Sequence, residues 1–97
     1  MALSVEANGR QCVIQISGEF NFHMRREFRG AYEKLPPETD FVIDLRRTTG
    51  VDSSALGMLL VLREHVTGKG RISIVNAPPK IRELLNVAQF GKIFSVS

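Results

Sequence analysis

The sequence has few of the features that mark secreted, metal-binding or membrane-spanning proteins. It contains one cysteine, Cys12, so no internal disulfide can form, and its two histidines do not cluster with that cysteine at a metal-ligand spacing. The longest apolar run, residues 55–62, is about eight residues, whereas a membrane-spanning helix needs roughly 18. Residues 1–6 lack the basic start and the apolar stretch of a signal peptide. We therefore expect a cytoplasmic protein that needs neither a cofactor nor a metal.

Length and composition predict a single globular domain over residues 1–97. The hydrophobic fraction of 43% and the charged fraction of 24% are ordinary for a folded domain, which excludes disorder and low complexity. The formal net charge of +3 is too small to make nucleic acid the default partner. Basic side chains gather at Arg25, Arg26, Arg29, Arg46 and Arg47. This cluster fits either a solvated helix face plus a loop, or a patch that steers an acidic protein partner.

The first part of the chain predicts a β-hairpin. Residues 3–7 alternate apolar and polar side chains, Asn8-Gly9 is a two-residue turn signal, and residues 11–17 have the length of a strand. Cys12 and every second residue after it share one face of this second strand. We therefore expect Cys12 to be a small buried hydrophobe and not a nucleophile.

A helix and a third strand follow the hairpin. Residues 18–21 are expected to end the second strand, with Asn21 as the N-cap of a helix over residues 22–34. The helix stops before Pro36-Pro37, which cannot donate helix hydrogen bonds. Residues 41–45 are short, β-branched and apolar, which predicts an interior strand covered on both faces, and residues 46–51 predict a polar loop.

The second half predicts two more helices around a fourth strand. Asp52-Ser53-Ser54 precedes a helix that extends to about Thr67 and is stopped by residues 68–70. Residues 71–75 predict a strand, residues 92–96 a short edge strand, and Pro78-Pro79 opens a last helix. The side chains of that helix expected to face inward are Ile81, Leu84, Leu85 and Ala88. The order predicts an α/β fold with a mixed, mostly parallel sheet and helices on one or both of its faces.

Polar side chains follow two strands of this predicted sheet. If those strands are parallel neighbours, one neighbourhood is shared by Asn21, Asp44, Asp52, Ser53 and Ser54. A helix needs only one cap, so at least one hydroxyl stays free at a helix start, where exposed N–H groups and the helix dipole favour a phosphate. The alternative is that these residues do nothing beyond capping the helix.

The helix after the serines is apolar on all sides over residues 55–62, more than one face on a sheet requires. In a small domain some of Met58, Val61 and Leu62 should then lie at the surface. Either neighbouring elements cover them, or they form a docking surface for another protein, and Gly57 fits both accounts. The expected partner contacts are Ala55, Leu56, Gly57, Met58 and Val61.

An enzyme is not supported. His65 lies about 18 Å along the helix from Ser53 at 1.5 Å per residue, so it cannot be the base of a serine nucleophile. His23 is expected to be an exposed first-turn residue. The sequence has no Gly-Xaa-Ser-Xaa-Gly elbow, no phosphate-cradling glycine loop and no paired carboxylates. We therefore expect no catalytic residue.

The strand, loop and helix around Asp52-Ser53-Ser54 resemble the signature of STAS domains. Within that family, the resemblance is greatest to the bacterial anti-sigma factor antagonists. The residues that carry the resemblance are the strand at 41–45, the segment Val51-Asp52-Ser53-Ser54-Ala55-Leu56-Gly57, the corner at 18–21 and the closing helix at 81–88 with Phe90 beyond it. Two positions depart from the pattern. Asn21 stands where relatives often have aspartate, which lowers the negative charge near Ser53. Ala55 stands where relatives usually have glycine, which stiffens the helix start.

The resemblance implies a binding protein controlled by phosphorylation. In such proteins the serine after the aspartate is phosphorylated by a partner that is both an anti-sigma factor and a serine kinase. The unphosphorylated form binds that partner and releases the sigma factor, and a metal-dependent serine phosphatase restores the binding form. Carried onto this chain, the phosphorylated residue is Ser53. The charge and the short apolar run predict no direct contact with nucleic acid and no insertion into a membrane, and a monomer is the simplest expectation for the free protein.

Three other functions compete with this expectation. One is a STAS subunit of a transporter or lipid-trafficking assembly that works without a kinase. Another is a small basic domain that binds nucleic acid, for which salt-sensitive retention on DNA is the test. The last is a hydrolase that uses Ser53.

Overall fold

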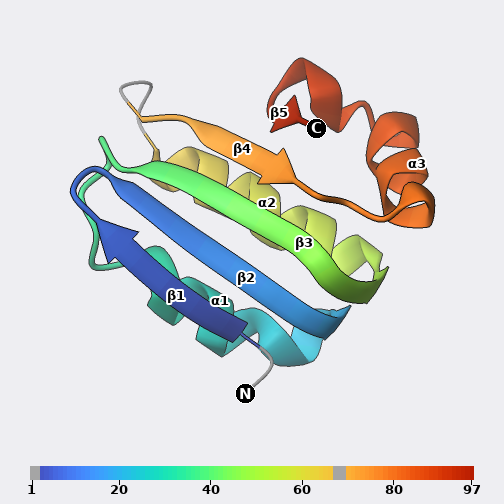
Figure 1. Cartoon of the computed structure of the whole chain (residues 1–97), viewed down its shortest axis with the longest axis horizontal. Helices are drawn as coiled ribbons and strands as arrows, with labels where there is room; N and C mark the ends of the chain where they lie inside the picture. Colours follow the sequence, from blue (N-terminus) through green and yellow to red (C-terminus); the bar gives the residue numbers. More distant parts are fainter. Residues whose placement is uncertain (1–2, 67–69) are drawn as a thin grey trace.

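The computed structural model describes residues 3–66 and 70–97. Within them the strands form one five-stranded sheet, in which strand order follows chain order (Figure 1). The strands are β1 (Leu3–Asn8), β2 (Gln11–Phe20), β3 (Asp40–Val51), β4 (Ile72–Val75) and β5 (Ser95–Val96). β1 pairs with β2 as an antiparallel hairpin, and every later strand is parallel to the one before it. The predicted mixed, mostly parallel sheet is confirmed.

Two helices cover one face of the sheet. They are α1 (Arg25–Tyr32), preceded by a 3-10 turn at Phe22–Met24, and α2 (Ser53–His65) (Figure 1). α3 (Pro79–Val87) lies past the end of β4, and a second 3-10 turn at Phe90–Lys92 leads into β5. Within residues 3–66 and 70–97, every helix is too short or too polar to span a lipid bilayer.

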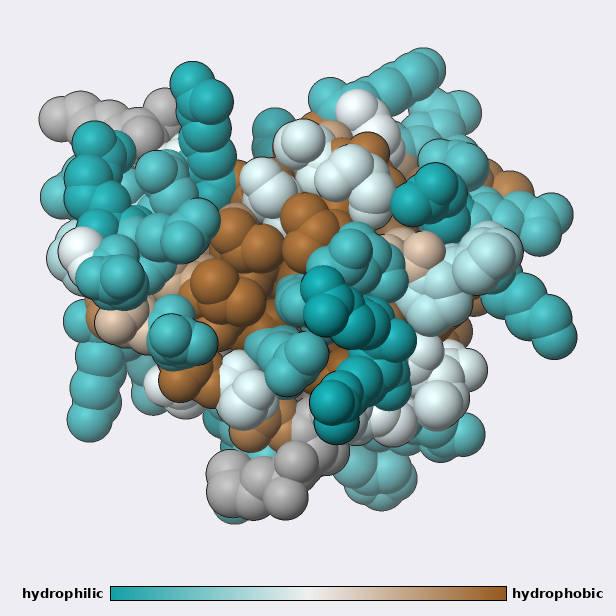
Figure 2. Space-filling view, viewed as in Figure 1, coloured by the Kyte–Doolittle hydropathy of each residue, from teal (hydrophilic) through white to brown (hydrophobic). Residues whose placement is uncertain are grey.

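The other face of the sheet carries no helix of the described chain, and Figure 2 shows it with apolar side chains at its centre and polar ones around them. Burial along β3 alternates accordingly: Phe41, Ile43 and Leu45 are buried, whereas Val42 and Asp44 are half-buried. The prediction that residues 41–45 are covered on both faces is therefore wrong. Every second side chain lies on the open face, where only its neighbours in the sheet shield it.

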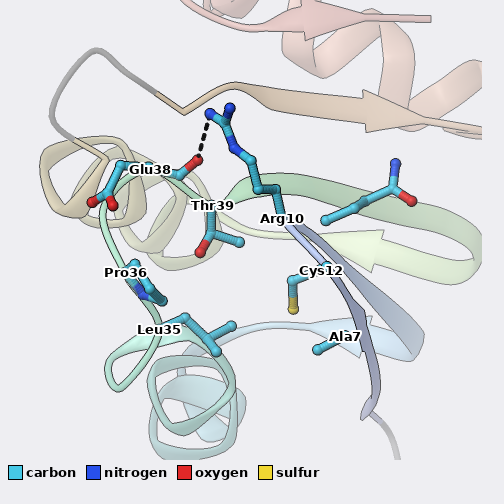
Figure 3. A pocket seen from close by; sticks show the side chains of 9 residues that line it. Ala7, Arg10, Cys12, Leu35, Pro36, Glu38 and Thr39 are labelled. Atoms are coloured by element: carbon cyan, nitrogen blue, oxygen red, sulfur yellow. Dashed lines mark hydrogen bonds between the residues drawn. The ribbon is translucent and has the colours of Figure 1, made fainter.

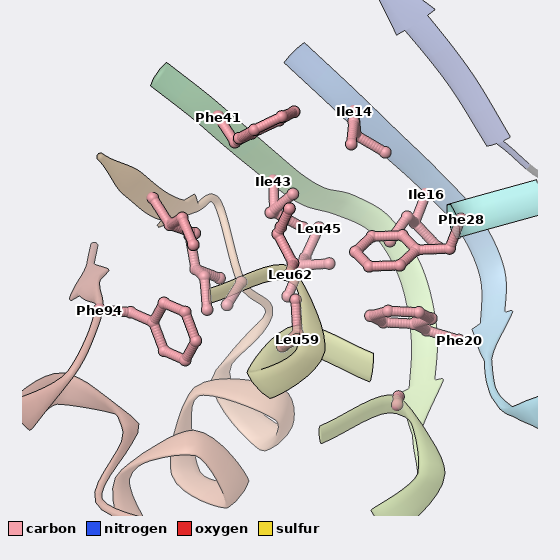
Figure 4. Packing of buried hydrophobic residues seen from close by; sticks show 14 of the residues in the cluster. Ile14, Ile16, Phe20, Phe28, Phe41, Ile43, Leu45, Leu59, Leu62 and Phe94 are labelled. Carbon is pink, nitrogen blue, oxygen red and sulfur yellow. The ribbon is translucent and has the colours of Figure 1, made fainter. Parts of the chain in front are cut away.

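The hydrophobic core lies between the sheet and the helices α1 and α2 (Figure 4). The rings of Phe20 and Phe28 pack with their centroids 5.2 Å apart, and Leu59 and Leu62 of α2 are buried against the sheet. Leu62 is thus not among the surface residues of α2. Cys12 has no exposed surface, and this burial raises the pKa of its thiol above the ordinary value. Its expected role as a buried hydrophobe is confirmed.

β2 and β3 are both longer than predicted. β2 continues through residues 18–20, and β3 continues through residues 46–51, which the sequence predicted as a loop. The pairing shifts register after Gln15 and again after Gly18, and each shift places an extra residue in β3. Gly18 has a φ of +82°, which favours glycine.

The first register shift explains why β3 does not look like a strand in the sequence. Arg46 and Arg47 are both exposed, and Thr48 then returns to the core, where its Oγ1 donates to the Ile16 carbonyl at 2.8 Å. Two exposed residues in succession break the alternation by which a strand is recognised.

The helix boundaries also differ from the prediction. The expected helix over residues 22–34 is a 3-10 turn followed by the shorter α1. α2 ends at His65, with Val66 as its C-cap; the predicted end at Thr67 and the stop at Gly68 and Lys69 lie outside the described residues.

Helix α3 presents a narrower face to the core than predicted. Ile81 and Leu85 are buried as expected, but Leu84 and Ala88 are exposed, so the inward placement of these two is wrong. Because α3 lies at the end of the sheet and not across it, a single i, i+4 pair is enough to anchor it.

Shortening a side chain of α2 that lies in the core should destabilise the fold far more than shortening one that lies at the surface. We expect Leu62→Ala to lower the free energy of unfolding by about 2–5 kcal/mol, because it leaves a cavity in the core. Leu60, which is 41% exposed on the same helix, should cost less than about 1 kcal/mol when changed to alanine. Urea denaturation measures both, and equal losses would contradict the placement of the core.

Candidate functional site

Asp52 determines how helix α2 begins. Its backbone is extended, and its Oδ1 accepts a hydrogen bond of 2.9 Å from the Ala55 amide, so Asp52 is the N-cap. Ser53 is therefore the first residue of the helix and Ser54 the second. Ser53 is exposed, and Ser54 is half-buried. The capping role thus falls on the carboxylate and leaves the hydroxyl of Ser53 at the surface.

The end of β2 places Asn21 at the same edge of the sheet. Phe20 pairs with Val51, and the Asp52 amide lies 3.4 Å from the Phe20 carbonyl. Because β2 and β3 are parallel, both strands end here, and each is followed by the start of a helix. Free N–H groups and the positive ends of helix dipoles make such an edge favourable for a phosphate.

The side chain of Asn21 is engaged locally. Its Oδ1 accepts from the His23 amide at 3.0 Å, which confirms Asn21 as a helix cap, although of the 3-10 turn. Its Nδ2 lies 3.4 Å from Oε2 of Glu19. Glu19 therefore supplies a carboxylate at this corner, beside the neutral side chain of Asn21.

Asp44 does not belong to this site. It lies on the open face of the sheet, where its Oδ1 accepts from the Arg46 amide at 2.9 Å and from Nδ2 of Asn76 at 3.3 Å. Roughly 20–25 Å of strand separates it from Asp52, because β3 continues well beyond residue 45. The expectation that Asp44 is a neighbour of Ser53 is therefore wrong.

A groove of about 460 Å³ runs between α1 and α2 and reaches the start of α2. Its α2 wall consists of Ser54, Gly57, Met58 and Val61. Its other wall, called the α1 wall, consists of Phe22 from the preceding 3-10 turn and of Arg25, Phe28, Arg29 and Tyr32 from α1. Both walls follow helical spacing, so the groove is the valley between two adjacent helices.

The expected partner contacts divide between this groove and the core. Gly57, Met58 and Val61 line the groove, and Val61 is 54% exposed. Ala55 has no exposed surface, so its expected contact with a partner is wrong; helical phase places it on the face that packs against the sheet. Leu56 packs against the core from the flank of α2 opposite the groove.

The sequence did not assign Phe22 and the arginines of α1 to the site. Phe22 is 52% exposed, and the guanidinium of Arg25 lies 4.5 Å from the centre of its ring. Arg29 is paired with Glu33 at 3.1 Å. An exposed aromatic residue beside a basic cluster was the available signal, but only the packing of α1 against α2 shows that both line a groove.

The two histidines are placed as expected. His65 is held near the end of α1, where its Nε2 lies 2.8 Å from the Leu35 carbonyl and its ring packs against Tyr32. His23 is exposed in the 3-10 turn. Over residues 3–66 and 70–97, no group of three or more His, Cys, Asp or Glu side chains is arranged to hold a metal ion.

A second hollow, of about 410 Å³, lies at the opposite end of β2 and β3 (Figure 3). Leu35, Pro36 and Thr39 form one side of it, and Arg10 bridges its rim by donating to the Glu38 carbonyl at 3.2 Å. The thiol of Cys12 lies at its floor, and burial raises the pKa of this thiol above its ordinary value.

Comparison with known proteins agrees with this architecture. The family model described as "Mlab, STAS domain" matches residues 3–95. A STAS-domain containing protein of Pseudomonas aeruginosa strain UCBPP-PA14 is 43% identical over 93 residues, which cover 94% of this chain and 92% of that relative.

Solved structures with the same fold come from more than one functional group. An anti-sigma factor antagonist from Mycobacterium paratuberculosis has a TM-score of 0.82 at 21% identity, covering 97% of this chain and 82% of its own. The anti-sigma factor antagonist SpoIIAA of Bacillus, in its unphosphorylated form, has 0.72 at 24%, with coverages of 99% and 87%. A sulfate transporter family protein from Wolinella succinogenes has 0.78 at 18%, with coverages of 94% and 79%. At these identities the likeness establishes the fold.

The capping geometry predicts different effects for neighbouring substitutions. Asp52→Ala removes the bond to the Ala55 amide and should lower the free energy of unfolding by about 1 kcal/mol. Ser53→Ala leaves that bond intact and should change stability by no more than about 0.5 kcal/mol. Chemical denaturation of the two variants measures this, and a larger loss for Ser53→Ala would show that the serine, not the aspartate, caps the helix.

Proposed function

The chain belongs to the STAS domain family, and we propose that it is a protein-binding switch of the anti-sigma factor antagonist type, controlled by phosphorylation of Ser53. The unphosphorylated chain binds a cytoplasmic anti-sigma factor with serine kinase activity and so releases a sigma factor. A metal-dependent serine phosphatase restores this form. The observation that carries the proposal is the exposed hydroxyl of Ser53, the first residue of α2, beside the groove between α1 and α2.

The position of Ser53 suits a modification that leaves the fold intact. Phosphorylation adds about −1.5 to −2 charges and three strong acceptor oxygens. The unpaired N–H groups and the dipole at the start of α2 offset part of this charge, while the Asp52 carboxylate opposes it. Since Ser53 is exposed and takes no part in the cap, no core contact has to break.

The same phosphate acts strongly on an incoming partner. Ser54 lines the groove, so a dianion on Ser53 lies at the end of the surface that the partner must cover. The partner either strips water from the phosphate or places its own groups against it. A penalty of roughly 3 kcal/mol lowers affinity more than a hundredfold, which is enough for a switch.

A second candidate is a STAS subunit that works in a transporter or lipid-trafficking assembly without a kinase. The likeness to a sulfate transporter family protein favours it. Co-purification distinguishes the two functions. A soluble kinase or phosphatase supports the switch, and a membrane ATPase complex supports the subunit.

Substitution at Ser53 should separate binding from phosphorylation. We expect Ser53→Ala to bind the partner and to resist phosphorylation, and Ser53→Asp to bind more weakly because its carboxylate carries part of the phosphate's charge. Pull-down with both variants, together with mass-spectrometric mapping of the phosphate, measures this. A phosphate on Ser54 that persists in Ser53→Ala would reject the assignment.

The groove predicts a contrast between adjacent residues of α2. Val61 lines the groove and is 54% exposed, while Leu60 points away from it and is 41% exposed. Val61→Glu, and likewise Met58→Glu, should weaken partner binding by at least about thirtyfold, because each buries a charge in the interface. Leu60→Glu is the matched control and should bind normally. All three variants should melt cooperatively, and unchanged affinity for Val61→Glu and Met58→Glu would place the docking surface elsewhere.

A further inference from the structure

The geometry points to an amphipathic α-helix with acidic flanks as the partner segment that occupies the groove between α1 and α2. This inference rests on the proposed function, since it names what the partner inserts at that surface. It is carried by the shape of the groove, by the open space at Gly57 and by the sign of the charges on the α1 wall.

The shape of the groove favours a helix over an extended strand. Both walls are helices, whose backbone groups are already paired, so they offer no ladder of hydrogen bonds to a strand. The α2 wall runs from Ser54 to Val61, about 10 Å along the helix axis at 1.5 Å per residue. Two adjacent helices leave a valley in which a third helix places side chains at i, i+3, i+4 and i+7.

Gly57 leaves room for such a helix. A Cβ atom added at Gly57 would meet no other atom within 4 Å, so the position opens into free space above the groove. The residues beside it, Met58 and Val61, are apolar, and Met58 has a flexible side chain that adapts to the shape of a partner. The α2 wall is therefore suited to apolar side chains inserted from a backbone that approaches closely.

The charges on the α1 wall select acidic flanks. The ionisable side chains that line the groove are Arg25, Arg29 and the weakly acidic Tyr32, so its charge is positive. Arg25 is stacked on Phe22 at 4.5 Å, which holds its guanidinium at the groove while its N–H groups stay available to a carboxylate. Arg29 uses its Nε toward Glu33, and a guanidinium has further donors.

Acidic flanks also explain how phosphorylation acts on the same groove. The arginines attract a carboxylate of the partner, whereas a phosphate on Ser53, next to the groove-lining Ser54, repels one. A basic partner segment would show the opposite behaviour, since the phosphate would strengthen its binding. The sign of the flanking charge therefore determines the direction of the switch.

The test uses two stapled helical peptides of about 18 residues, with leucines at every third or fourth position and either glutamates or lysines on the flanks. Fluorescence anisotropy measures their affinity for the full chain. We expect the glutamate peptide to bind at least about tenfold more tightly than the lysine peptide. Equal affinities, or binding of neither peptide, would overturn the inference.

Charge reversal at matched positions localises the contact. Arg25→Glu should reverse the preference between the two peptides. Arg26→Glu makes the same charge change on the same helix but outside the groove, so it should leave the preference as it is. An equal response to the two variants would show that net charge, not the groove, selects the peptide.

Filling the groove gives a second, uncharged control. Gly57→Leu occupies the groove, whereas Gly30→Leu adds the same side chain at an exposed position of α1 outside it. Both changes favour the helix by removing a glycine, so both variants should fold. Only Gly57→Leu should abolish binding of the glutamate peptide. A dimer in sedimentation that Gly57→Leu disperses would assign the groove to a second copy of this chain and overturn the inference.

The outcome separates this inference from the proposed function. Suppose that the captured partner still binds Ser53→Ala more tightly than Ser53→Asp, while the two peptides bind equally or not at all. The switch then stands and the acidic helix is rejected. If the peptides behave as expected and no phosphate is ever found on Ser53, the groove assignment stands and the phosphorylation switch is rejected.

Discussion

The hydrogen bond from the Ala55 amide to the carboxylate of Asp52 is the contact on which the site depends. This bond pairs the Ala55 amide at the start of α2, which would otherwise have no partner within the helix. Ser53 is therefore not needed as the cap and stays exposed. A serine that capped the helix itself would carry the phosphate on the capping oxygen, and the phosphate oxygens would then compete with that oxygen for the capped amide. With the aspartate in that role, the same residue position can change its charge while the helix start keeps its geometry.

The parallel pairing of β2 and β3 brings the rest of the site to this point. Both strands end at one edge, so the helices that follow them, α1 and α2, start there and pack side by side against the sheet. Their shared valley begins beside the serines. A chemical change at the first residue of α2 therefore affects any partner that docks along the two helices. The topology places the proposed phosphorylation site next to the proposed binding groove.

The order of the elements, the sheet, the cap at Asn21 and the exposure of Ser53 all follow patterns that a single sequence carries. Three features of the structure could not be predicted from the sequence. The second half of β3 was not recognised as a strand, because its bulges place the exposed residues Arg46 and Arg47 in succession and interrupt the alternation of buried and exposed side chains. The continuation of that strand carries Asp44 away from the site. The groove needed the packing of α1 against α2, because Ala55 and Val61 look alike in an apolar run and only the helical phase relative to the sheet distinguishes them.

The most direct measurement compares stability and affinity in one sample. Phosphoserine incorporated at position 53 gives a homogeneous protein, whose free energy of unfolding and partner affinity are measured beside those of the unmodified chain. If the phosphate acts on docking and not on the fold, we expect a change in stability below about 1 kcal/mol and a loss of affinity above a hundredfold, equivalent to roughly 3 kcal/mol. A loss of stability as large as the loss of binding energy would contradict it, because the phosphate would then act by disrupting the fold.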